Sequence, residues 1–259
     1  MSDLVQVERD GVLATVVLNR EEKLNALTKG MWRRLGELLD ELSADGNLRC
    51  IILRGAGEKS FSPGNDIGEF VSERCNREQA SAYGKIMQNT FRAFNECRHP
   101  IVAMIHGICV GGGLELAAAC DLRICGKSSR FGAPIKRLGL VMALPEIQVL
   151  VNLVGRATTL EVLLEGEIMD AEQALAKGLV NRVVADDQVE AEAIATAVRI
   201  AEGAPLVARW HKKFINRMTV HAPLSQTEID EGYACYDTED FQIGYQSFLK
   251  KLKPEFKGR

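Results

Sequence analysis

The chain has 259 residues, of which 46% are hydrophobic and 26% are charged, enough to build the core of one large globular domain with or without a helical appendage. The net charge of −3 and the lack of a long basic run argue against a nucleic-acid partner. The N-terminus has no signal-peptide pattern, no apolar run approaches the roughly 20 residues of a membrane span, and the seven cysteines form no CxxC pair, so we expect a cytoplasmic protein with no membrane partner and no metal site.

Two strand-like runs lie between Leu4 and Leu18 on either side of Asp10-Gly11, a good hairpin turn. Thr28 then offers an N-cap for an amphipathic helix that ends near Asp45-Gly46, and Cys50–Leu53 reads as a short buried strand.

A small-residue loop over 55–66 leads to expected helices from Ile67 and over 81–95. Strands are expected at Ile101–Ile105, Leu122–Cys125 and 179–184, with a loop over 131–139 and a helix over 145–154. From Val189 onward the pattern is helical. Strands alternating with helices to about residue 185 predict an α/β body followed by a helical C-terminal part.

The segment over 101–121 is the most informative, because a strand, three glycines and a helix follow one another there. Glycines at Gly111–Gly113 let backbone approach a ligand closely, and the free N–H groups at the helix start suit an oxyanion. Glu115 in the first turn places a carboxylate near those donors, which suits proton transfer beside a carbonyl. The alternative is a tight packing turn with a glutamate that complements the helix dipole.

Several segments together resemble the crotonase (enoyl-CoA hydratase/isomerase) superfamily. They occur in the order and at the spacing of that family, over nearly the whole chain: NREEKLNAL (19–27), SFSPGNDIGEF (60–70), HGICVGGGLELAAACDLRI (106–124), FGAPIKRLG (131–139), AEQALAKGLVNRVV (171–184) and CYDTEDFQIGYQSFLKKLKPEF (235–256).

The resemblance implies a spiral of ββα units over residues 1–200 and a C-terminal helical trimerisation region over 201–259. It also implies a homotrimer or homohexamer and an acyl-CoA thioester as substrate, without a further cofactor. Enzymes of this family stabilise an enolate-like anion with two backbone N–H groups.

Carried over to this chain, the oxyanion hole belongs to the amides of Asn65 and Gly112. Asn65 stands in a GND triplet where the family usually has GAD, so its side chain is expected to narrow the pocket without removing the amide. A missing oxyanion-hole donor costs roughly 3–4 kcal/mol in other enzymes. The coenzyme A moiety is expected along two short segments, at Lys23, Leu24, Ala26, Gly64, Asp66 and Ile67.

Glu115 matches the first catalytic glutamate of the hydratases, whereas Ile135 stands where they carry the second. Glu146 is a candidate replacement, although a first-turn glutamate after Pro145 is more often structural. Asp66, His106, His211 and Cys109 are each better explained by structural roles.

We therefore expect hydration, dehydration or double-bond isomerisation of an enoyl-CoA, with Glu115 as acid/base. The alternatives are thioester hydrolysis or decarboxylation in the same oxyanion hole, or, because of Ile135, an acyl-CoA-binding scaffold without catalysis.

Overall fold

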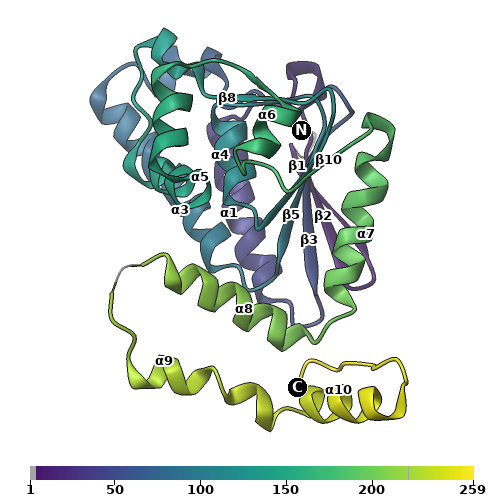
Figure 1. Ribbon diagram of the computed structural model, residues 1–259. Coiled ribbons are helices and arrows are strands. Elements are labelled where there is room, and N and C mark those ends of the chain that lie inside the picture. The colour runs from purple at the N-terminus through teal and green to yellow at the C-terminus, as the bar shows by residue number, and fades with distance from the viewer. Residues whose placement is uncertain (1–3, 221) are drawn as a thin grey trace.

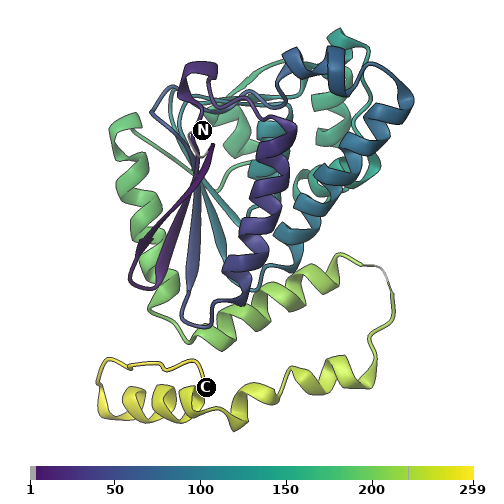
Figure 2. The same cartoon turned by 180° about the vertical axis from the view of Figure 1, so that it is seen from behind.

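The computed structural model describes residues 4–220 and 222–259. Figures 1 and 2 show the chain as a body of strands and helices with a helical C-terminal arm. The elements follow in the order β1 (Val5–Asp10), β2 (Leu13–Leu18), α1 (Lys29–Ala44), β3 (Cys50–Gly55), β4 (Ser60–Ser62), α2 (Phe70–Glu73), α3 (Arg77–Glu96), β5 (Ile101–Ile105), β6 (Ile108–Val110), α4 (Gly112–Ala119), β7 (Leu122–Gly126), β8 (Arg130–Gly132), α5 (Leu144–Leu164), β9 (Met169–Asp170), α6 (Ala171–Ala176), β10 (Arg182–Val184), α7 (Val189–Ala201), α8 (Pro205–Met218), α9 (Gln226–Glu231) and α10 (Glu239–Lys250).

The predicted hairpin and first helix are confirmed. Strands β1 and β2 pair antiparallel across the Asp10-Gly11 turn. The Thr28 hydroxyl accepts a hydrogen bond from the Met31 amide at 3.2 Å, so it caps α1 as the sequence indicates.

Two sheets form the body. The larger has the strand order β1-β2-β3-β5-β7-β10, and the smaller has the order β4-β6-β8-β9. The pairs β3/β4, β5/β6 and β7/β8 each give one strand to the larger sheet and the next to the smaller, so the chain winds as a spiral. The smaller sheet was not predicted, because its strands have only two or three residues and carry no readable alternation.

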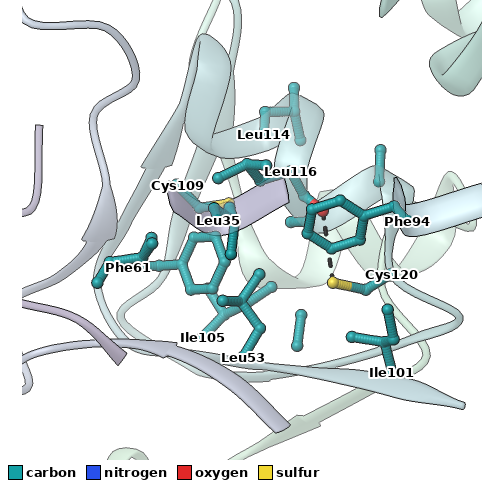
Figure 3. Packing of buried hydrophobic residues seen from close by; sticks show 14 of the residues in the cluster. Leu35, Leu53, Phe61, Phe94, Ile101, Ile105, Cys109, Leu114, Leu116 and Cys120 are labelled. Atoms are coloured by element: carbon teal, nitrogen blue, oxygen red, sulfur yellow. Dashed lines mark hydrogen bonds between the residues drawn. The ribbon is translucent and has the colours of Figure 1, made fainter. Parts of the chain in front are cut away.

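Both faces of the larger sheet are covered. Cys50 and Ile52 of β3 face α7, whereas Ile51 and Leu53 face the main core, as expected for a buried parallel strand. Figure 1 shows α7 on one side of the sheet and α1, α3 and α4 on the other. Figure 3 shows the main core at close range, where side chains of these helices meet those of β3 and β5: Leu35, Phe94, Leu116, Leu53, Ile101 and Ile105.

The C-terminal part is helical, as predicted. Helix α8 runs across the end of the body, and α9 and α10 lie beyond it in both views (Figures 1 and 2). The Arg49 guanidinium donates to the Phe256 carbonyl at 2.6 Å and so ties the C-terminal tail to the body. The division at residue 200 remains a prediction.

Among the described residues, α5 alone is long and apolar enough to cross a membrane by length and composition. Gly155, with φ of +74°, breaks it into two helices, and the break falls where the predicted helix over 145–154 ends. A single such helix is weak evidence, so the absence of a membrane partner stays a prediction.

Candidate active site

The site is built on the central strand–turn–helix unit. Strand β5 has the predicted bounds, the short strand β6 occupies the expected turn, and α4 begins at Gly112. The third glycine is required by packing, because a Cβ on Gly113 would lie 2.1 Å from the Ser62 carbonyl oxygen. The start of α4 therefore lies directly against the end of β4.

The loop after β4 brings a second backbone segment to the start of α4. Gly64 has φ of +93°, and a Cβ there would lie 2.5 Å from the Gly112 nitrogen. As the first residue of α4, Gly112 has no acceptor for its N–H within that helix. The bridge between Leu27 and Asn65 uses the amides of Leu27 and Asp66, so the Asn65 N–H lies outside it. The two amides proposed for the oxyanion hole are thus close neighbours with no partner in these elements.

Gly64→Ala is expected to lower kcat by about 10²–10³-fold, because the new methyl group must push the loop away from Gly112 and open the pair of donors. Steady-state kinetics checks this. Gly11→Ala is the matched control, since Gly11 also has a positive φ (+55°) but no atom within 4 Å of the added Cβ. Similar kcat values for both variants would contradict this geometry.

The Asn65 side chain is fixed by a residue that the sequence did not single out. The Trp32 indole donates to the Asn65 Oδ1 at 2.6 Å. This hydrogen bond sets the direction of the side chain that replaces the usual alanine, and it anchors the loop on α1.

A cavity of about 470 Å³ opens beside the two amides. Its lining is mostly apolar, with a few convergent polar groups, as in small-molecule sites. The lining residues are Ala26, Pro63, Asn65, Asp66, Ile67, Phe70, Arg74, Met87, Val110, Gly111, Gly112, Glu115, Pro134, Ile135, Arg137, Leu138, Leu140, Val141, Met142 and Glu146.

The residues expected to bind coenzyme A lie partly in this lining and partly outside it. Ala26, Asp66 and Ile67 line the cavity, and Gly64 stands between two lining residues. Lys23 and Leu24 are exposed on the preceding loop, outside the lining. The Arg20 guanidinium holds the two segments together, since it donates to the Asp66 carboxylate at 2.6 Å and the Ala26 carbonyl at 3.1 Å.

Besides the partly exposed Asp66, two buried carboxyl groups line the cavity, Glu115 from α4 and Glu146 from the first turn of α5. Glu115 is 4% exposed and Glu146 is 7% exposed. The Glu115 Oε2 is buried and has no hydrogen-bond partner in the described part of the chain, whereas the Glu146 Oε2 accepts from the Ala143 amide at 2.8 Å. Glu146 therefore has the structural role at the start of α5 that the sequence favoured, and it also lines the cavity. Ile135 also lines the cavity.

The electrostatics of the two carboxyl groups favour the state in which only one of them is protonated. Burial, followed by the charge of Glu146, raises the pKa of Glu115 to about 8. Burial also raises the pKa of Glu146, although the Ala143 hydrogen bond and the charge of Arg74 act against it. Because the amide stabilises a charge on Glu146, the pair is best described with the proton on Glu115.

The raised pKa of Glu115 should make the stability of the protein depend on pH. Unfolded, Glu115 loses its proton near the ordinary value of 4.5; folded, it keeps the proton up to about 8. The contribution of Glu115 to the free energy of unfolding is therefore largest at low pH. It is lost as the pH rises from 4.5 to about 8. Glu115→Gln is neutral throughout, so its Tm relative to wild type should rise between pH 5 and pH 8.5 by at least about 4 °C.

Thermal unfolding of both proteins across this range tests the shift. Glu58→Gln makes the same chemical change on the exposed surface and is the control. A Tm difference between Glu115→Gln and wild type that does not vary with pH would contradict the raised pKa.

The other sequence candidates lie outside the lining, except Asp66. His106 is half-buried, and His211 lines a separate cavity beside Lys212. Burial raises the pKa of the Cys109 thiol, in keeping with an inert packing role. Asp121, shortly after α4, forms an ion pair with Lys212 at 2.8 Å. Among the described residues, no three His, Cys, Asp or Glu side chains cluster as metal ligands.

Sequence reasoning missed Trp32, Arg20 and Arg74. Their roles depend on contacts between segments far apart in the chain, and no local motif marks them. Arg74, Met87, Val141 and Met142 also line the cavity, whereas the exposed Leu144 is outside the lining.

Comparison with known proteins identifies the family. The model of the enoyl-CoA hydratase/isomerase family matches residues 8–259. The short-chain-enoyl-CoA hydratase of Clostridium acetobutylicum is 33% identical over 98% of each chain. The mitochondrial Delta(3,5)-Delta(2,4)-dienoyl-CoA isomerase of Dictyostelium discoideum is 30% identical over 95% of this chain and 87% of its own.

A solved structure supports the same family assignment. The crystal structure of an enoyl-CoA hydratase/carnithine racemase from Magnetospirillum magneticum is 49% identical and superposes with a TM-score of 0.98, covering 100% of this chain and 97% of its own. The predicted crotonase-like spiral is thereby confirmed. The chain belongs to the enoyl-CoA hydratase/isomerase family, and it is an enzyme of the hydratase/isomerase type.

Proposed function

We propose that the protein hydrates or isomerises enoyl thioesters of coenzyme A, with Glu115 and Glu146 transferring protons and the Asn65 and Gly112 amides holding the thioester oxygen. The observation that carries the proposal is the presence, around one cavity, of two buried carboxyl groups and two backbone amides that α4 and the Leu27–Asn65 bridge leave without an acceptor. Relatives named as an enoyl-CoA hydratase and a dienoyl-CoA isomerase support this reaction class.

In hydration, the ionised Glu146 removes a proton from water as the water oxygen bonds to C3 of the enoyl group. The double-bond electrons move onto the thioester oxygen, where the two amides stabilise the enolate. Glu115 then delivers its proton to C2, which completes the addition of one water molecule. Dehydration is the same sequence in reverse.

Isomerisation uses the same groups without water. One carboxylate removes a proton from the carbon at one end of the allylic system, and the enolate is protonated at the other end.

The argument for a non-catalytic scaffold came from Ile135. Because Glu146 supplies a second carboxyl group to the cavity, that argument loses its basis.

The coenzyme A part is assigned to the loop over Lys23, Leu24 and Ala26 and the facing residues Gly64, Asp66 and Ile67. The ion pair between Arg20 and Asp66 supports this assignment, because it holds the two loops in one fixed arrangement at the cavity mouth.

The assembly is proposed to be a homotrimer or homohexamer. Large apolar side chains of the C-terminal arm stand exposed in the single chain, among them Tyr233, Tyr236, Phe248, Leu249 and Leu252. Such a surface marks an interface. Size-exclusion chromatography with light scattering is expected to give three or six times the chain mass of 28.5 kDa. A monomer would contradict the proposal.

The direct test of the reaction is mass spectrometry of acyl-CoA thioesters incubated with the protein in deuterated water. A 2-enoyl thioester is expected to gain water, or a 3-enoyl thioester to gain deuterium through double-bond migration. Release of free coenzyme A or loss of carbon dioxide would indicate a hydrolase or a decarboxylase instead. Binding without any of these changes would overturn the proposal.

A further inference from the structure

Arg74 is the cavity residue to which the proposed reaction gives no role. It follows α2 directly and lines the same cavity as Glu115 and Glu146. Its Nη1 is buried, and no described residue forms a hydrogen bond with it. Among residues 4–220 and 222–259, no carboxylate lies within ion-pair distance of its guanidinium, although its charge acts on both glutamates.

The guanidinium is held in place by aromatic rings. Its central carbon lies 4.8 Å from the centroid of the Phe70 ring and 4.7 Å from that of the Tyr83 ring. The Tyr83 hydroxyl is itself fixed by the Glu69 carboxylate at 3.2 Å. Stacking orients the planar cation, but it leaves the N–H groups of the buried Nη1 without an acceptor among the described residues.

A buried donor without an acceptor destabilises the free protein. Because arginine stays protonated in proteins, it cannot become neutral to avoid this cost. A ligand that supplies an acceptor removes this cost. The best match to the planar fork of a guanidinium is a carboxylate, which accepts two parallel hydrogen bonds.

We propose that Arg74 binds a carboxylate carried by the acyl group, so that the preferred substrate is the mono-thioester of a dicarboxylic acid. This inference rests on the proposed function, which places the acyl chain in the cavity. It adds that the far end of that chain is anionic and that Arg74 determines specificity.

Two other anions compete for this role. The phosphates of coenzyme A are one, but Lys23, the cationic side chain among the residues assigned to coenzyme A, is exposed outside the lining, whereas Arg74 shares the cavity with the two glutamates. The glutamates themselves are the other. The Glu146 carboxylate already accepts from Ala143, and Glu115 holds a proton.

Binding of saturated thioesters tests the proposal without relying on turnover. Calorimetry would compare succinyl-, glutaryl- and adipyl-CoA, each with its neutral methyl ester, and free coenzyme A. Wild type should bind at least one free acid about 10- to 100-fold more tightly than its methyl ester. Arg74→Gln should remove most of this preference, and Arg74→Lys should keep part of it.

Three results would overturn the proposal. No preference for the acid at any chain length would exclude a carboxylate site. Equal weakening of free coenzyme A and the acids by Arg74→Gln would assign Arg74 to a phosphate. A preference that survives Arg74→Gln, with the variant's circular dichroism and Tm matching wild type, would place the site elsewhere.

Turnover gives a second, separate readout. The ratio of kcat/KM for glutaconyl-CoA to that for its methyl ester should fall about 10- to 100-fold in Arg74→Gln. An unchanged ratio would count against the proposal. If neither compound reacts but the acids still bind selectively, the reaction assignment fails while the role of Arg74 stands.

Discussion

Replacing Glu115 by glutamine is expected to lower kcat for an enoyl thioester by about 10²–10⁴-fold, the usual contribution of a positioned acid/base. Glutamine keeps the shape and the neutral charge of the protonated side chain, but it has no proton to give to C2. Glu115 is 4% exposed, and its Oε2 has no hydrogen-bond partner among the described residues, so this oxygen is free to face the substrate. Steady-state kinetics with crotonyl-CoA and glutaconyl-CoA measures the effect.

The same variant must be shown to fold, because its role is chemical. Below about pH 4.5, where Glu115 is protonated in both the folded and the unfolded wild type, the Tm of Glu115→Gln should stay close to that of wild type. Glu58→Gln again provides the control on the exposed surface. A kcat equal to that of wild type would remove Glu115 from the mechanism.

Replacing Glu146 by glutamine is expected to lower kcat for hydration by about 10²-fold or more, because water is then left without a base. Glutamine retains an oxygen that accepts from the Ala143 amide, so the start of α5 should keep its cap. Glu146→Ala removes both functions and should lose about 1 kcal/mol of stability in addition. Kinetics and thermal unfolding of both variants separate catalysis from capping.

A hydration rate that survives Glu146→Gln would leave Glu115 to work alone. In that case Ile135→Glu, which restores a carboxylate at the position used by the hydratases, provides a further comparison. If the Ile135→Glu/Glu146→Gln protein recovered the activity lost in Glu146→Gln alone, the two positions would be interchangeable sources of the same base.

Sequence patterns located the parts of the site that depend on local structure. The strand at Ile101–Ile105 and the helix beginning within the three glycines follow from apolar periodicity and backbone chemistry, and the structure has both. Resemblance to the family added the long-range pairing of Asn65 with Gly112, which no local pattern contains. The close approach of Gly64 to Gly112 brings those two segments together.

The remaining features depend on tertiary contacts. The strands of the smaller sheet are too short to show a period. The sequence therefore predicted loops or turns where these strands lie. The sequence predicts only that Glu146 is a glutamate in the first turn of a helix. The packing of α5 beside α4 places it in the same cavity as Glu115. Arg74 sits between rings from α2 and α3, and its sequence neighbours do not indicate this.

Exchange of the C2 hydrogens of a saturated thioester tests the central claim most directly. Butyryl-CoA and glutaryl-CoA have no double bond, so deuterium enters C2 in deuterated water only when a base removes a proton and the enolate is stabilised. Mass spectrometry should show enzyme-dependent incorporation at C2 that slows by about 10²-fold or more in Glu115→Gln. Bound thioester without exchange in the wild type, or equal exchange in both proteins, would contradict an enolate formed by Glu115 beside the Asn65 and Gly112 amides.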